Sequence, residues 1–77
     1  MTKLVIIPAA KMAKILQQLG FKLIRQKGSH VFFKHSDGRA TVIPMHKGED
    51  LGKGITRSIL ADIEISLEDY DRLRQEV

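Results

Sequence analysis

The sequence contains no cysteine. This absence excludes a disulfide framework, a thiolate metal site and a cysteine nucleophile, and it fits a cytoplasmic protein. Long hydrophobic runs are also lacking. The apolar stretch over residues 4–10 stops at Lys11 and leads into a helical pattern, so neither a membrane span nor a cleaved leader is predicted. With 77 residues, the chain predicts one small domain over residues 1–77, with too modest a core for a large cofactor.

Acidic residues are scarce over most of the chain. Residues 1–61 hold eleven Lys and Arg against three Asp and Glu, a net charge of +8, whereas residues 62–77 hold two Arg against six acids, a net charge of −4. The asymmetry indicates a polyanion-binding body with an acidic segment kept away from the binding surface. On charge alone, a solvated basic surface without a ligand is the alternative.

Three segments carry helical signals. The first begins near Pro8, a favoured early helical residue, and ends at Gly20. Its apolar residues follow the i, i+3, i+4, i+7 spacing of an amphipathic helix: Met12, Ile15, Leu16 and Leu19. A second helix is predicted over residues 55–63, with a buried stripe of Ile55, Ile59, Leu60 and Ile63. In a short final helix, Ser66 is the predicted N-cap, and Leu67, Tyr70 and Leu73 point inward.

Three segments between the first two helices read as strands: residues 21–27, 31–35 and 39–45, which are rich in aromatic and β-branched residues. The pairs Gly28-Ser29 and Asp37-Gly38 are typical of two-residue hairpin turns and would join them. The predicted fold class is therefore α+β. Its element order is α-β-β-β-α with a three-stranded antiparallel sheet and a short C-terminal helix.

Two-residue turns at both positions would fix the side of the sheet that each residue occupies. In that register one side carries Phe21, Leu23, Phe32, Ile43 and Met45, with His30, Arg25, Lys27 and Lys34 towards its margins. We assign this side to the helices. The opposite side would carry Lys22 and expose an apolar band that is large for a free surface, and we predict it as a partner-binding site. The band consists of Ile24, Val31, Phe33 and Val42. A shift of one residue would exchange the two sides.

The Gly28-Ser29-His30 turn is the candidate site for chemistry. An imidazole can move protons near neutral pH, and clustered Lys and Arg side chains hold and neutralise phosphate. The candidate phosphate-binding residues are Arg25, Lys27, Lys34 and Lys47. Gly28 would supply the turn conformation, and Ser29 would orient the phosphate or the imidazole. Taken alone, the triplet is also consistent with an ordinary turn followed by a packed or solvated histidine.

A metal site is not predicted from the residue spacing. His30 and His35 are five residues apart in one strand, so their side chains would point to opposite sides. The few acids of the basic body, Asp37, Glu49 and Asp50, fall in predicted loops without a paired-carboxylate arrangement. We therefore expect neither a metal nor another cofactor.

The ordered landmarks of the chain resemble a known family. Gly20-Phe21 follows the first helix, and the segment Arg25-Gln26-Lys27-Gly28-Ser29-His30 comes next. The landmarks continue with Phe33-Lys34-His35, Asp37-Gly38-Arg39, Ile43-Pro44-Met45-His46 and Arg57-Ser58-Ile59-Leu60. Over roughly residues 10–70, this set is similar to the HicA-type toxins of HicAB toxin–antitoxin pairs. The segment Ile7-Pro8-Ala9-Ala10 departs from the Ser-Gly helix start expected in that family.

The resemblance implies a fold like the double-stranded-RNA-binding domain, a metal-independent endoribonuclease activity on mRNA and neutralisation by a HicB-type antitoxin. It carries the family's active histidine to His30 and the neighbouring turn to Gly28 and Ser29. No role is carried to His35 or His46. The competing hypothesis is a non-catalytic module that binds duplex RNA by charge and shape. The sequence leaves open whether the chain forms a homodimer or a hetero-oligomer with the antitoxin.

Overall fold

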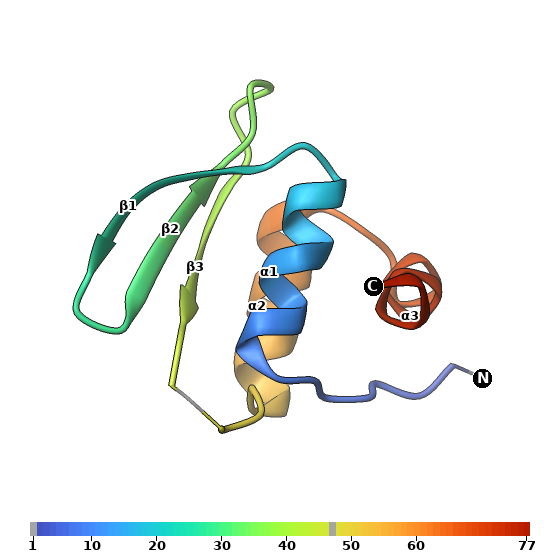
Figure 1. Ribbon diagram of the computed structural model, residues 1–77. Helices are drawn as coiled ribbons and strands as arrows, with labels where there is room; N and C mark the ends of the chain where they lie inside the picture. Colours follow the sequence, from blue (N-terminus) through green and yellow to red (C-terminus); the bar gives the residue numbers. More distant parts are fainter. Residues whose placement is uncertain (1, 47) are drawn as a thin grey trace.

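The chain alternates between helix and sheet in the predicted order (Figure 1). A computed structural model describes residues 2–46 and 48–77. Its elements are α1 (Ala9–Gln18), β1 (Lys22–Lys27), β2 (His30–Lys34), β3 (Ala40–Pro44), α2 (Lys53–Ile63) and α3 (Leu67–Glu76). The three strands form one antiparallel sheet in the order β1-β2-β3. The predicted fold class is confirmed.

Helix α1 forms where the apolar spacing predicts it. Met12, Ile15 and Leu16 are fully buried, so the i, i+3, i+4 stripe faces the core. Pro8 has extended backbone angles at the N-cap, and its carbonyl accepts hydrogen bonds from the N–H groups of Lys11 and Met12. A proline is tolerated at this end because its missing N–H would have no partner inside the helix.

Helix α2 is turned differently from the prediction. Its buried residues are Thr56, Ile59, Leu60 and Ile63, whereas Ile55 is 44% exposed. Thr56 Oγ1 donates to the Gly52 carbonyl at 2.8 Å, so its hydroxyl is satisfied and does not oppose burial. The prediction that Ile55 is buried was therefore wrong. Thr56 takes the buried position on the helix that the hydrophobic pattern had assigned to Ile55.

Helix α3 begins at the predicted cap. The Ser66 side chain accepts a hydrogen bond from the Asp69 N–H at 3.1 Å, which satisfies one of the free donors at the helix start. Tyr70 and Leu73 are buried, and Leu67 is half-buried. The Tyr70 hydroxyl donates to the Val5 carbonyl and so ties the N-terminal segment to this helix.

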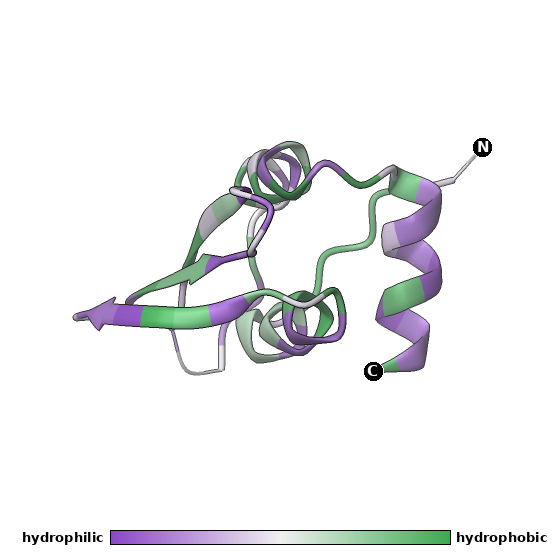
Figure 2. Ribbon diagram, turned by 90° about the horizontal axis from the view of Figure 1, so that it is seen from above, coloured by the Kyte–Doolittle hydropathy of each residue, from purple (hydrophilic) through white to green (hydrophobic). Residues whose placement is uncertain are grey.

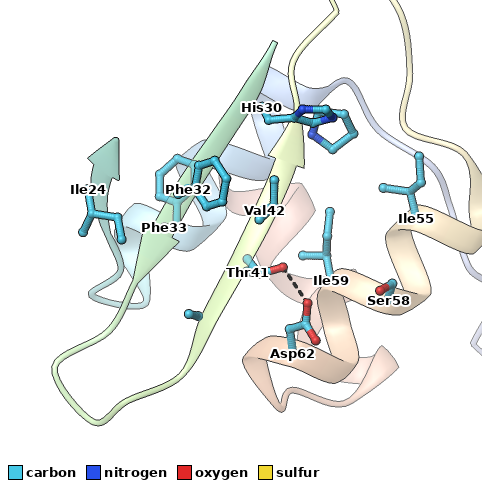
Figure 3. Close-up of a pocket in the computed structure, with 12 residues that line it drawn as sticks. Ile24, His30, Phe32, Phe33, Thr41, Val42, Ile55, Ser58, Ile59 and Asp62 are labelled. Carbon is cyan, nitrogen blue, oxygen red and sulfur yellow. Dashed lines mark hydrogen bonds between the residues drawn. The ribbon is translucent and has the colours of Figure 1, made fainter. Parts of the chain in front are cut away.

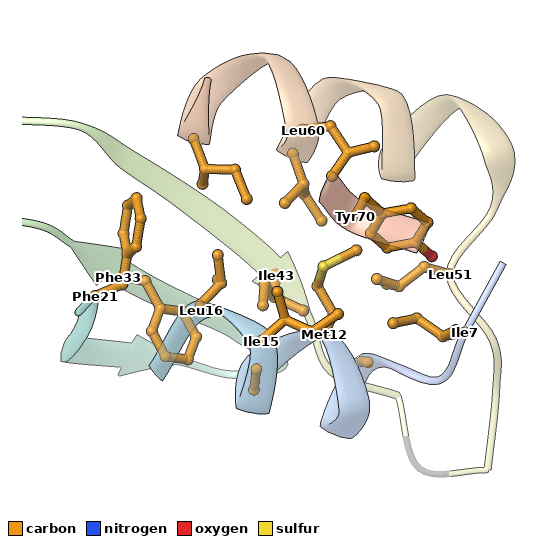
Figure 4. Packing of buried hydrophobic residues seen from close by; sticks show 14 of the residues in the cluster. Ile7, Met12, Ile15, Leu16, Phe21, Phe33, Ile43, Leu51, Leu60 and Tyr70 are labelled. Atoms are coloured by element: carbon orange, nitrogen blue, oxygen red, sulfur yellow. The ribbon is translucent and has the colours of Figure 1, made fainter. Parts of the chain in front are cut away.

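The elements are stacked in layers. Figures 1 and 2 show the pair α1 and α2 between the sheet on one side and α3 on the other. The core fills the space between these layers and receives side chains from all of them (Figure 4). Its fully buried members include Met12, Ile15, Leu16, Ile43, Ile59, Ile63 and Tyr70. Among the residues that the structure describes, no helix is long and apolar enough to cross a membrane.

The two hairpins differ in their loops. The β1–β2 turn is the predicted two-residue Gly28-Ser29 loop, with Lys27 directly opposite His30. The β2–β3 loop has three residues, 36–38, because the His35 N–H donates to the Arg39 carbonyl at 2.8 Å and the Gly38 N–H to the His35 carbonyl at 3.0 Å. Gly38 adopts a φ of +101°, as the last residue of such a loop does.

The additional loop residue shifts the β2–β3 register by one position and exchanges the sides of β2. Val31 is paired with Ile43 and Phe33 with Thr41, and all four side chains face the helices and are buried. The predicted exposed band was therefore wrong for Val31 and Phe33, which are 3% and 2% exposed. The assignment of Phe32 to the helix side was wrong for the same reason.

We expect the two strands of the β1–β2 hairpin to differ strongly in their contribution to stability, even at residues on the same side of the sheet. Phe33→Ala should lower the free energy of unfolding by about 3–5 kcal/mol, because it removes a buried aromatic ring. Leu23, its direct neighbour across β1, is 52% exposed, so Leu23→Ala should change the free energy by less than about 0.5 kcal/mol. Urea denaturation of both variants measures the difference. Equal losses would contradict the burial of Phe33.

Candidate nucleic-acid interface

The side of the sheet that points away from the core collects most of the predicted site residues. Directly opposed residues in an antiparallel pair lie on the same side. Lys27 lies opposite His30, Arg25 opposite Phe32, and Lys22 opposite Lys34. On the β3 strand, Pro44, Val42 and Ala40 pair with His30, Phe32 and Lys34. We call this surface the His30 face: Lys22, Arg25, Lys27, His30, Phe32, Lys34, Ala40, Val42 and Pro44.

A bulge in β1 adds one cation to this face. The register changes between Leu23, which is opposite Phe33, and Arg25, which is opposite Phe32. The extra residue is Ile24, and it breaks the strict alternation of sides. Lys22 was predicted on the opposite side, and this assignment was wrong because the alternation does not hold across the bulge. Arg25, Lys27 and Lys34 share the face of His30 as predicted. Lys47 lies outside the described residues.

His30 is placed by a turn that is anchored on both flanks. Gly28 has a φ of +58°, and an added Cβ would meet nothing within 4 Å, so the glycine serves the backbone conformation rather than a close approach. The Met45 N–H donates to the Ser29 carbonyl at 2.6 Å, and Gln26 Nε2 donates to the Gly28 carbonyl at 3.1 Å. These bonds hold the exposed His30 at the first position of β2.

The charge on the His30 face is not balanced within the sheet. None of the three strands contains Asp or Glu. Lys22 and Lys34 lie directly opposite each other, and like charges in this position destabilise a sheet. A sheet surface with one directly opposed cation pair and no acidic residue in its strands is suited to binding a polyanion.

His35 belongs to the fold rather than to this face. Its Nε2 donates to the Leu19 carbonyl at 3.1 Å when Nδ1 accepts from the Asp37 N–H, also at 3.1 Å. The ring packs edge-on against Phe21 at a centroid distance of 5.1 Å. The ring therefore connects the end of α1 to the second hairpin. Within residues 2–46 and 48–77, no three His, Asp or Glu side chains are grouped so that they could hold a metal ion.

A groove runs between the His30 face and α2 (Figure 3). It encloses about 440 Å³, and its walls include Phe32 and Val42 from the sheet and Ile55 and Ser58 from α2. Phe32 and Ile55 were predicted in the core, so the hydrophobic pattern did not indicate them as groove residues. Ser36 was a usable signal, because a serine before Asp37-Gly38 is compatible with a three-residue loop, and that loop turns Phe32 outward.

The element order and the antiparallel sheet give the chain a fold like that of a double-stranded-RNA-binding domain. Its His30 face is basic and has an exposed histidine at the rim. The family model for the HicA toxin of bacterial toxin–antitoxin systems matches residues 9–65, which extend from α1 through α2. The chain therefore belongs to the HicA toxin family. It is the toxin of a toxin–antitoxin system, and the family implies an antitoxin as its partner. No curated protein matches the chain.

Reversing one charge of the Lys22–Lys34 pair should separate binding from stability. We expect Lys34→Glu to weaken the affinity for an RNA oligonucleotide and to leave the free energy of unfolding unchanged or raise it by up to about 0.5 kcal/mol, because a repulsive pair becomes attractive. Fluorescence anisotropy and urea denaturation measure the two quantities. Lys14→Glu on the exposed side of α1 is the matched control. Equal weakening in both variants would show that only net charge matters.

Proposed function

We propose that this toxin is a metal-independent endoribonuclease that cleaves mRNA, with His30 as its acid/base group. The observation that carries the proposal is the position of His30. It is exposed at the end of β2, directly opposite Lys27, on a face whose strands hold four Lys and Arg side chains and no acid. Such a surface brings a proton-transfer group and phosphate-binding cations to one place.

RNA supplies its own nucleophile, so the demands on the protein are small. The 2′-hydroxyl oxygen attacks the adjacent phosphorus, the bond to the 5′-oxygen of the next nucleotide breaks, and a 2′,3′-cyclic phosphate and a 5′-hydroxyl are left. His30 removes the proton of the 2′-hydroxyl or delivers one to the departing 5′-oxygen. Lys27, Lys34 or a backbone N–H of the turn stabilises the charge that develops on the phosphorane oxygens.

The supporting residues have separate tasks in this proposal. Gly28 permits the positive φ of the turn, and Ser29 orients the phosphate or the imidazole. Arg25 holds the RNA backbone near the rim of the sheet. Lys47 stays a predicted phosphate contact that lies outside the described residues. None of these steps requires a metal ion, because the cations and the histidine supply charge and proton transfer.

Masking of the His30 face by the antitoxin would keep the activity silent in resting cells. An acidic and partly apolar partner is complementary to this surface. Of the apolar residues predicted for partner binding, Ile24 and Val42 remain accessible, at 56% and 36% exposed. Val31 and Phe33 are withdrawn from the proposed partner surface because they lie in the core.

Loss of the imidazole should abolish cleavage without unfolding the protein. We expect His30→Ala to lower the rate of RNA cleavage by roughly 100-fold or more and to remove growth arrest on induction, because proton transfer loses its group. Circular dichroism checks the fold, and Lys14→Ala on the exposed side of α1 provides a control outside the site. A folded His30→Ala protein that cuts at the wild-type rate would refute the assignment. Duplex-RNA binding without any cleavage by the wild type would favour the non-catalytic module.

Cleavage should continue in excess EDTA and should produce 2′,3′-cyclic phosphate or 3′-phosphate ends. DNA of the same sequence should remain intact, since it lacks the attacking hydroxyl. Mass spectrometry of the products and a chelation series test both expectations. Loss of activity on chelation that Mg²⁺ or Mn²⁺ restores would contradict the metal-independent mechanism.

A further inference from the structure

We propose that the groove between the His30 face and α2 receives one unpaired nucleobase of the RNA, next to the phosphate that is cleaved, and thereby sets the sequence preference of the toxin. This inference rests on the proposed function. It assigns a binding role to Val42, Ile55 and Asp62, residues of β3 and α2 that carry no part of the proton transfer.

The two ends of the groove carry different groups, a candidate proton-transfer residue and a carboxylate. Figure 3 shows His30 at one end and Asp62 at the other, with Val42 and Ile59 between them. Val42 and Ile55 stand on opposite walls and remain 36% and 44% exposed, while Ile59 is buried beneath them. A flat group that enters beside His30 would thus cover apolar side chains that are otherwise open to water.

The charges around the groove favour a nucleotide over an apolar protein side chain. The Arg25 guanidinium lies 4.6 Å from the centroid of the Phe32 ring, so a cation is held at the rim where Phe32 lines the groove. Lys27 and Lys34 flank the same wall on the His30 face. Proteins that recognise single-stranded RNA usually combine two features. Cations bind the phosphate backbone, and an apolar or aromatic surface beside them contacts the base.

Asp62 gives the slot a means to distinguish bases. Its Oδ2 accepts a hydrogen bond from Thr41 Oγ1 at 2.9 Å, which orients the carboxylate from the buried Thr41. An ionised carboxylate only accepts hydrogen bonds and has capacity for further donors. Uracil offers only its N3–H, which lies between two carbonyl oxygens that repel a carboxylate. Bases with an exocyclic amino group, which are adenine, cytosine and guanine, should therefore be preferred over uracil at this position.

The test compares one RNA oligonucleotide, carrying a cleavage site mapped with the wild type, with versions that are abasic at the nucleotide on either side of the scissile phosphate. We expect the wild type to cut the intact RNA roughly tenfold faster than one of the abasic versions, as base stacking contributes about that much. Val42→Ala combined with Ile55→Ala should move this rate ratio towards one. Leu23→Ala removes an aliphatic side chain that is at least as exposed but lies on the other side of the sheet, so it should keep the wild-type ratio.

Asp62→Asn supplies a second, independent variant. The amide oxygen can still accept the Thr41 hydrogen bond, so thermal unfolding should be unchanged, while the preference for amino bases over uracil should fall.

Wild-type rates that are equal on intact and both abasic substrates, together with loss of cleavage in His30→Ala, would overturn the groove assignment and leave the proposed function standing. Groove variants that keep the ratio but weaken antitoxin binding would assign the groove to the protein partner instead. No cleavage of any RNA would refute the proposed function itself.

Discussion

The three-residue loop between β2 and β3 is the constraint on which the rest of the structure depends. It places Val31 opposite Ile43 and Phe33 opposite Thr41, so these side chains meet the helices and fill the core. The same register turns His30, Phe32 and Val42 to the other side. Since side chains alternate along a strand, one hairpin connection decides both what is buried and which residues surround the histidine.

The cations of the His30 face place a cost on the sheet that the core must offset. Lys22 and Lys34 oppose each other, and β1 is an edge strand whose side chains are all exposed. Buried contacts on the opposite side of β2 compensate for this repulsion, because Val31 and Phe33 pack the middle strand against the core. The charged residues on β1 also protect its free edge against pairing with other chains. Stability and the binding surface thus occupy opposite sides of the same strands.

The rotation of α2 contributes the other half of the groove. Because Thr56 satisfies its hydroxyl on the Gly52 carbonyl, it can take a buried position, and Ile55 is left on the exposed side of the helix. Ser58 and Asp62 then follow Ile55 along the groove wall. Thr41 links the two walls through its hydrogen bond to Asp62. A single satisfied hydroxyl therefore allows an isoleucine to face the solvent beside the candidate site.

The sequence by itself determined the elements, their order and the local environment of His30. The signals for these features each lie within a few neighbouring residues, so they can be recognised without knowing what the segment packs against. They are the stripe of Met12, Ile15 and Leu16, the Ser66 cap and the Gly28-Ser29 turn. Only the tertiary structure decided which side of β2 is buried, where the Ile24 bulge shifts the register, and that Thr56 rather than Ile55 enters the core. Each of these outcomes depends on a shift of one residue in strand register or on a small rotation of a helix. Hydrophobic periodicity alone leaves such alternatives nearly equivalent, and the packing of the sheet against the helices selects one of them.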